Sequence, residues 1–343
     1  MIHLICNNAN SKKDGIGDYS YHLYKALQQE FAGDVFIHSA SSGIKGRLEK
    51  VLSFKMSQVL AKVSCKLKTN DIVILEYPFV ECNILILLFL WVLRAVLLHR
   101  NGVFVLSLHE YERVNFLRKF ITRHFISSAD LVLVTDQQTK SWISSKYHKP
   151  VFIRTIPSNI FEKPEAEINK NRKAFIYFGL ITKAKAIDEM LQAWKKFNSN
   201  QEYILYFLTS SQFTNDYEKY GVKYLPNLNN TDVVRYFCKA AFCILPIIPS
   251  VSVINASYKT SLLYHCIPIG HFDEEISAGQ FCINVNGNSV DDLLQGLKES
   301  QELGESEYAH KISIIKKLPQ ATFEKTASEY IEAIECYYGN FKK

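Results

Sequence analysis

Short apolar runs and amphipathic stretches alternate along almost the whole chain of 343 residues. Runs such as IHLIC at 2–6 and DIVILEY at 71–77 have the length and composition of buried strands. The stretches between such runs carry apolar residues at helical spacing. This alternation predicts an α/β fold, in which parallel strands form a sheet with helices packed on both faces.

The alternation is interrupted at residues 156–174, where two prolines and mixed charges replace the apolar periodicity. We interpret this segment, IPSNIFEKPEAEINKNRKA, as a linker, because the chain is longer than a usual single domain. The sequence therefore predicts two tandem, doubly wound, Rossmann-like domains, residues 1–160 and 161–325, with a cleft between them. In such sheets ligands bind beyond the carboxyl ends of the strands, and an interdomain cleft suits two substrates.

Cysteine usage indicates a reducing compartment. Eight cysteines are scattered without a C-x-x-C pair, and several lie in apolar runs such as AFCIL and GQFCINV. They resemble small buried hydrophobic residues rather than a disulfide framework or a zinc site. The N-terminus lacks the charged start and cleavage site of a signal peptide. We expect a cytoplasmic protein.

Positive charge is concentrated in the first half. Residues 1–160 hold 20 Lys/Arg against 12 Asp/Glu, and the stretch Phe116–Phe125 alternates Arg118, Lys119 and Arg123 with large apolar residues. A basic amphipathic helix of this kind fits an anionic membrane surface, although a solvated helix face explains the same pattern. No nucleic-acid-binding motif accompanies the charge, so we expect no nucleic-acid partner.

The most apolar stretch of the chain is too short for a membrane span. Ile84–Leu93 is uninterrupted, and Arg94 follows it. A spanning helix needs about 20 apolar residues. We expect a buried or half-inserted helix here.

Two glycines follow the first predicted strand. Gly15 and Gly17 precede an amphipathic stretch that begins near Tyr19, so the pattern predicts a tight turn before a helix. The free N–H groups at such a helix start favour anionic or sugar-like ligands. The third glycine of the dinucleotide-binding fingerprint is absent. An ordinary strand–helix turn explains these residues equally well.

The second half carries two groups of candidate phosphate ligands. Gly179 ends a predicted strand, Lys185 follows six positions later, and a helix starts near Ile187, with Lys183 as an additional cation. A surface lysine before a helix is the alternative. Further on, Lys259-Thr260-Ser261-Leu262-Leu263 is predicted to open a helix whose free N–H groups hold a phosphate. An ordinary N-cap before a buried helix is the alternative there.

Taken in order, these residues resemble the GT-B fold nucleotide-sugar glycosyltransferases of family-4 type. The resemblance extends over nearly the whole chain and rests on the segments Gly15–Asp18, Tyr77-Pro78, His109-Glu110, IPSNI and Phe178–Asp188. It implies the GT-B architecture, with residues 326–343 forming a closing helix that packs back on the N-terminal domain.

The chain departs from that family at three positions. The arginine that usually follows the glycine is Leu180 here, and Lys183 is a candidate replacement. The family's two glutamates correspond to Val253 and Ser261. A subset of polysaccharide-assembly transferases lacks these glutamates and carries a basic residue before a pattern like Thr260-Ser261-Leu262-Leu263.

The resemblance implies transfer of a sugar from a UDP- or GDP-linked donor to a growing, lipid-linked surface polysaccharide such as capsule or O-antigen. It implies no cofactor and no metal, since lysines and helix ends neutralise the leaving group. A nucleotide-sugar epimerase and a non-catalytic nucleotide-binding partner are the alternatives. We expect a cytoplasmic enzyme that docks peripherally on the inner membrane face. The predicted catalytic residues are Asp18 and His109, and the predicted donor-binding residues are Gly15, Gly17, Gly179, Lys183, Lys185, Lys259, Thr260, Ser261 and Leu262.

Overall fold

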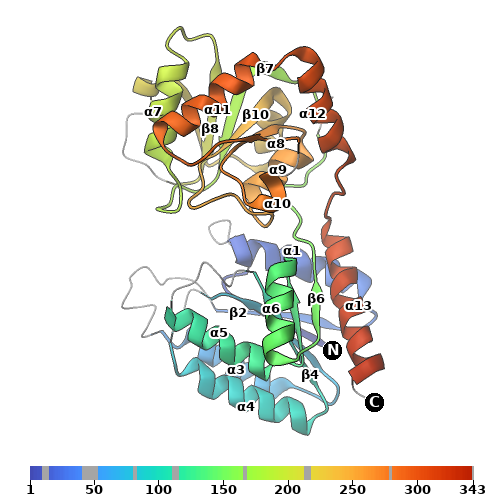
Figure 1. The fold of residues 1–343 in the computed structure, drawn as a ribbon. Helices are drawn as coiled ribbons and strands as arrows, with labels where there is room; N and C mark the ends of the chain where they lie inside the picture. Colours follow the sequence, from blue (N-terminus) through green and yellow to red (C-terminus); the bar gives the residue numbers. More distant parts are fainter. Residues whose placement is uncertain are drawn as a thin grey trace. The chain divides into compact units, whose positions relative to one another are not determined.

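The computed structural model describes residues 1–9, 15–40, 53–79, 83–109, 116–164, 168–211, 218–277 and 280–341 (Figure 1). The chain forms two compact units. One comprises Met1–Pro157 together with Ala321–Lys343, and the other comprises Ser158–Gln320. The division falls inside the predicted linker, three residues before the expected boundary at 160, and the last helix belongs to the first unit. The final residues of that linker form a strand instead of a connection, since β7 begins at Asn171.

The first unit is built on a six-stranded parallel sheet in the order β2-β1-β3-β4-β5-β6. Every residue of β1, β3, β4 and β5 is buried, which explains their continuous apolar sequences. The strands are β1 (Ile2–Cys6), β2 (Val35–Ser39), β3 (Ile72–Tyr77), β4 (Val103–Leu108), β5 (Leu131–Val134) and β6 (Val151–Ile153).

Helices cover both faces of this sheet. The helices α3 (Lys55–Lys66), α4 (Ile86–His99), α5 (Phe116–Ser128) and α6 (Gln137–Tyr147) share one apolar core cluster with the strands. A second cluster joins α1 (Gly15–Glu30) and α13 (Phe323–Phe341) to the strands. Buried side chains of α13 such as Tyr330 therefore belong to the core of the first unit.

The second unit repeats the design with the strand order β12-β11-β10-β7-β8-β9, again parallel throughout. The strands are β7 (Asn171–Phe178), β8 (Ile204–Thr209), β9 (Val222–Pro226), β10 (Ala240–Leu245), β11 (Ile267–Gly270) and β12 (Ile283–Asn284). The helices are α7 (Ile187–Phe197), η1 (Glu218–Tyr220), α8 (Asn230–Lys239), α9 (Ala256–Leu263), α10 (Glu274–Ser277), α11 (Val290–Glu302) and α12 (Glu305–Lys317). The prediction of two Rossmann-like α/β domains is confirmed.

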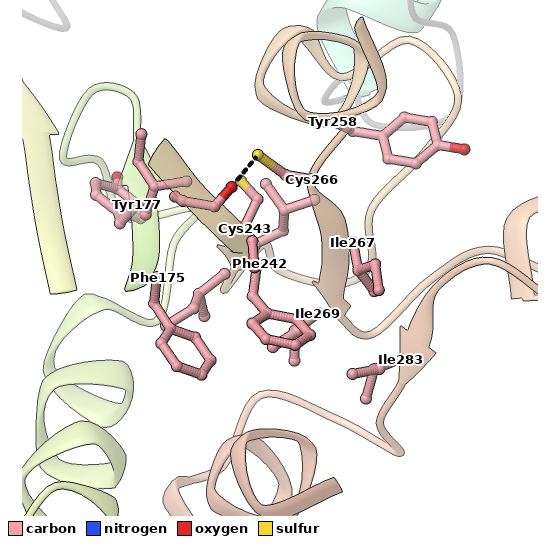
Figure 2. Packing of buried hydrophobic residues seen from close by; sticks show 14 of the residues in the cluster. Phe175, Tyr177, Phe242, Cys243, Tyr258, Cys266, Ile267, Ile269 and Ile283 are labelled. Atoms are coloured by element: carbon pink, nitrogen blue, oxygen red, sulfur yellow. Dashed lines mark hydrogen bonds between the residues drawn. The ribbon is translucent and has the colours of Figure 1, made fainter. Parts of the chain in front are cut away.

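Side chains from adjacent strands fill the core of the second unit. Figure 2 shows Phe175, Phe242 and Ile269 packed together, and the rings of Phe175 and Phe242 stack with their centroids 5.0 Å apart. Cys243 and Cys266 lie in the same core, where burial raises the pKa of both thiols. No cysteine of the described residues forms a disulfide, and these two act as small apolar side chains.

Candidate functional site

The carboxyl end of β7 carries the strongest candidate site of the second unit. Gly179 follows the strand with φ of +141°, a backbone conformation that side chains disfavour. A Cβ at this position would run into Nζ of Lys185 and would lie 3.3 Å from Oγ of Ser257. The backbone conformation therefore requires a glycine, and a lysine and a serine lie against the place that a side chain would occupy.

Local hydrogen bonds hold Lys185 in this position. Its backbone pairs with Ile247 in an isolated antiparallel bridge, and the next amide, that of Ala186, donates to the carbonyl of Pro246 at 2.9 Å. The ammonium Nζ donates to the hydroxyl of Tyr177 at 3.3 Å. Among the described residues no carboxylate pairs with Lys185. Burial without an opposite charge lowers the pKa of Lys185 to about 8.

Ser257 is a site residue that the sequence did not reveal. Its hydroxyl donates to the carbonyl of Phe178 at 2.7 Å, which ties the second residue of α9 to the end of β7. The two residues are far apart in sequence, and the contact exists only because β7 and β10 are adjacent in the sheet. The first amides of α9 consequently lie near Gly179 and Lys185.

The predicted start of α9 was wrong. The helix begins at Ala256, and Asn255 caps it by accepting from the amide of Tyr258 at 3.0 Å. Thr260 and Ser261 are therefore in its second turn, where they cannot offer free N–H groups. Both are buried, and their hydroxyls donate to the carbonyls of residues 256 and 258. Thr260 and Ser261 were predicted to bind the donor through free N–H groups at a helix start, and that physical reason no longer applies.

The other predicted donor residues are placed differently. Lys259 lies two positions after Ser257, about 200° around the helix, so the two side chains leave opposite sides of α9. Burial lowers the pKa of Lys259, and no partner for its ammonium is seen among the described residues. Lys183 is exposed in the loop before Lys185, and Leu262 packs against the core cluster of the second unit. The observed contacts therefore join Gly179 and Lys185 with Ser257 and leave the remaining residues outside that group.

The first unit contains a buried polar network around Glu76, at the end of β3. The Glu76 carboxylate accepts from Nε2 of His109 at 2.6 Å, from Oγ of Ser107 at 2.7 Å and from the hydroxyl of Tyr330 at 2.9 Å. Burial raises the pKa of Glu76, but the hydrogen bond and charge of His109, with Arg154 and Ser107, outweigh it, and the pKa is held below its ordinary value. Glu76 is therefore an anion that fixes the ring of His109.

Arg154 supplies the positive charge of this network. Its Nη2 lies 3.9 Å from Glu76, and neither side chain is exposed. Its Nη1 donates to the hydroxyl of Tyr19 at 3.2 Å, and its guanidinium carbon lies 5.2 Å above the centre of that ring. The ring of Tyr19 in turn meets His109 edge-on, with centroids 5.0 Å apart. Charge within the network is balanced by residues of the chain itself.

The glycine pair does not form a turn before a helix. Gly15 and Gly17 are inside the first turn of α1, which begins at Gly15 instead of near Tyr19. Asp18 lies in the same turn, where a carboxylate interacts favourably with the helix dipole, and its Oδ1 is 3.7 Å from Nε2 of His22. Asp18 and His109 are the predicted catalytic residues. Asp18 directly precedes Tyr19 in the chain, and the ring of Tyr19 contacts the ring of His109. Glu110 lies outside the described residues.

The described residues contain neither a cluster that could hold a metal ion nor a helix that could span a membrane. No cluster of three or more His, Cys, Asp or Glu side chains there is arranged to hold a metal ion. Likewise, within the described ranges, every helix is too short or too polar to cross a bilayer.

Comparisons with known proteins agree with the architecture. Anabaena HepE, solved in complex with UDP, is 10% identical, with 98% of this chain and 100% of that chain covered and a TM-score of 0.63. WaaG, a glycosyltransferase involved in lipopolysaccharide biosynthesis, is 10% identical over 97% of this chain and 98% of its own, with a TM-score of 0.61. An alpha-glucosyltransferase in complex with UDP and a 13-mer DNA is 11% identical, with 97% of this chain and 99% of that chain covered and a TM-score of 0.60.

These similarities show the fold. Over nearly its full length the chain has the two Rossmann-like α/β domains of the GT-B glycosyltransferase class. No protein-family model matches the sequence, and no curated protein matches it either.

Proposed function

We propose that this protein is a glycosyltransferase, which moves a sugar from a UDP- or GDP-linked donor to a growing, lipid-linked surface polysaccharide such as capsule or O-antigen. The observation that carries the proposal is the group formed by Gly179, Lys185 and Ser257 at the carboxyl end of β7. Ligands of doubly wound sheets bind at this edge. The similarity in fold to glycosyltransferases solved with UDP supports the same conclusion.

The chemistry of sugar transfer suits this group. When the bond between sugar and phosphate breaks, negative charge develops on the nucleoside diphosphate that leaves. Lys185 has no opposite charge in the described structure, and a phosphate beside it would favour its protonated form. The first amides of α9 add partial positive charge at the same place. The proposed enzyme needs no cofactor beyond its donor.

In the first unit, Asp18 and His109 are the proposed catalytic residues, and Gly15 and Gly17 in the first turn of α1 are proposed to lie beside the donor. A Cβ on Gly15 would meet no atom of the described residues within 4 Å. Glu76 would act as a positioning residue. It holds Nε2 of His109 at 2.6 Å and so fixes the orientation of the imidazole ring.

Nucleotide binding and nucleotide release together test the proposal. Thermal unfolding with UDP and with GDP should show stabilisation by one of them, and calorimetry should give its affinity. Release of that nucleotide from its sugar conjugate should require a lipid-linked glycan acceptor. No stabilisation by either nucleotide would overturn the proposal.

A non-catalytic role is the second candidate, because Val253 and Ser261 occupy the positions of the family's two glutamates. A protein of that kind would bind the nucleotide sugar but would release no nucleotide with any acceptor. An epimerase would interconvert two nucleotide sugars without an acceptor. DNA belongs in the acceptor screen, since one matched transferase was solved with it. A glycosylated DNA product would exclude the lipid-linked acceptor proposed above.

A further inference from the structure

The helix α4 exposes an apolar stripe on the side that faces away from the core. Its inner residues, including Leu90, Leu93 and Leu97, are fully buried. Its outer residues are as apolar as the inner ones, whereas a surface helix normally has a polar outer face. The exposed apolar residues on or just before this helix are Ile84 (56% exposed), Leu85 (43%), Leu88 (54%), Trp91 (59%), Val92 (45%) and Leu98 (61%).

The charged residue within this helix does not interrupt the stripe. Arg94 forms a two-pronged ion pair with Asp130, with contacts of 2.5 and 2.6 Å. Its charge is therefore neutralised within the unit. The helix is 14 residues long. That length corresponds to about 21 Å, less than the roughly 30 Å of a bilayer core, so the helix can lie along a membrane but cannot cross it.

The helices on either side of α4 are basic. Together α3, α4 and α5 contain no aspartate and no glutamate. Lys62 and Lys66 are exposed on α3, and Arg123 is exposed on α5. All three helices pack over the same face of the first sheet and lie side by side in Figure 1. The apolar stripe is thus bordered by basic side chains on both neighbouring helices.

A groove opens beside the stripe, between α3 and α4, with a volume of about 510 Å³. Ala61 and Cys65 line it from α3, and Phe89, Val92 and Val96 line it from α4. Val92 belongs to both the groove and the stripe, so the two form one continuous apolar surface. Lys62 and Lys66 adjoin the α3 residues of the groove along the chain.

We propose that this surface, the α4 docking face, binds an anionic membrane. Trp91, Leu88 and Leu98 would enter the boundary between headgroups and acyl chains, while Lys62 and Lys66 would contact lipid phosphates. A second copy of the chain is a poorer occupant. A symmetric dimer through this face would bring the same basic helices together, and their like charges would repel.

The α4 docking face differs from the region that the sequence predicts. The sequence assigns the membrane contact to α5, where cations and apolar residues alternate, and predicts a buried or half-inserted helix in the region of α4. In the structure α5 contributes exposed Phe116 and Phe120 together with its cations, but the continuous apolar stripe is on α4. Membrane docking is independent of sugar transfer, so either can fail while the other stands.

Co-sedimentation with vesicles tests the proposal. The full-length protein should pellet with vesicles of phosphatidylglycerol and phosphatidylcholine, and much less with phosphatidylcholine alone or at high salt. The double variants Leu88→Ser/Trp91→Ser and Lys62→Glu/Lys66→Glu should each bind about tenfold more weakly or worse. Matched controls in the second unit, Ile204→Ser and Lys195→Glu/Lys298→Glu, change exposed residues of the same kinds and should bind like wild type.

Tryptophan fluorescence locates the inserted residue. Trp91 is 59% exposed and Trp194 is fully buried, so a blue shift on adding anionic vesicles, quenched by brominated acyl chains, should come from Trp91. Trp91→Phe should abolish the shift while the protein still pellets, and Trp142→Phe should leave the shift unchanged. Wild-type pelleting by both double variants would overturn the proposal. So would loss of binding only in an Arg118→Glu/Lys119→Glu/Arg123→Glu variant. If the double variants changed the oligomeric state measured by light scattering but bound vesicles like wild type, the face would be assigned to a second copy of the chain.

Discussion

The two units treat buried charge in opposite ways. In the first unit, Glu76 and Arg154 are buried together, and the carboxylate accepts three hydrogen bonds from the chain. In the second unit, Lys185 has only the hydroxyl of Tyr177 as a hydrogen-bond partner for its ammonium in the described structure. The balanced charge of Glu76 positions His109, whereas Lys185, which has no opposite charge in the described structure, is available to an anionic ligand. The charge of Glu76 is therefore balanced within the first unit, whereas the described structure gives Lys185 no opposite charge.

Removing Glu76 should produce the largest effect on stability. Glu76→Ala leaves Arg154 buried without its counter-charge, which costs about 3–5 kcal/mol. Urea unfolding should show this loss in the transition of the first unit. Glu332→Ala removes an exposed carboxylate from α13 of the same unit and should change stability by no more than about 0.5 kcal/mol. Equal small effects for both variants would mean that the Glu76 network contributes nothing beyond an ordinary surface charge.

Removing Lys185 should lower activity without lowering stability, in contrast to the removal of Glu76. Lys185→Ala takes away a charge-assisted contact to the donor worth about 1.5–3 kcal/mol, so kcat/KM should fall about tenfold to a hundredfold. Stability without ligand should stay the same or rise, because a partly buried cation without an opposite charge disfavours folding. Lys183→Ala is the matched control, with a smaller kinetic effect expected from its exposed position. Wild-type turnover in a folded Lys185→Ala protein would exclude Lys185 from donor binding.

These contrasts were only partly visible in the sequence. Lys185 and Gly179 were found because both lie in one short segment with a recognisable spacing. Glu76 and Arg154 were missed, although Glu76 lies inside the apolar strand β3 and Arg154 directly follows the apolar strand β6, positions that charged residues rarely occupy without a partner. Their partners Tyr330 and Tyr19 are 254 and 135 residues away, so only the folded chain identifies them.

Helix starts were the weakest part of the sequence prediction. The sequence predicts a turn at Gly15 and Gly17, because glycine has no Cβ and allows a tight backbone turn, but helical backbone begins at the first of them. In α9, Asn255 was available as a cap four residues before the predicted start near Lys259. The two parallel sheets were predicted from the apolar runs, because burial on both faces leaves few alternatives, whereas the order of the strands comes from the structure alone.

The next largest effect is expected from a side chain at position 179, in the candidate site of the second unit. Gly179→Ala must hold φ of +141° and make room beside Lys185 and Ser257. We expect a loss of about 1–2 kcal/mol in stability and a similar loss in nucleotide binding. Gly221→Ala is a suitable control, since that glycine also has positive φ but has no atom near its Cβ position. If both variants lose nucleotide affinity equally, backbone strain is responsible and the contact with Lys185 is not.

The pKa of Lys185 predicts how donor binding depends on pH. The free protein's Lys185 has its pKa lowered to about 8, and a bound diphosphate favours the protonated form and raises it. Affinity should be flat below about pH 8 and should fall by up to about tenfold per pH unit above it, because binding then takes up one proton. The diphosphate itself is fully ionised in this range, since phosphate groups have a second pKa near about 6.

Calorimetry with UDP or GDP at a series of pH values measures this slope. Lys185→Arg keeps its charge at every pH and should give a flat profile. The same amine affects folding with the opposite sign. Its unfavourable burial is fully present below about pH 8 and is relieved as the pH rises toward its unfolded value of about 10.4. An identical slope in wild type and Lys185→Arg would assign the proton to another group.

Chelation should have the smallest effect of all, namely none. A divalent cation bound with the donor would need carboxylate oxygens, whereas the side chains grouped at the end of β7 are a lysine and a serine. Lys185 and the first amides of α9 supply positive charge at that place, so a metal ion would repeat their role. The turnover number should therefore be equal in EDTA, in magnesium and in manganese once a donor and an acceptor are known. Activity lost in EDTA and restored by either metal would show that a cation shares the charge now assigned to Lys185. The positive charge at the end of β7 would then come from a metal ion as well as from Lys185 and the first amides of α9.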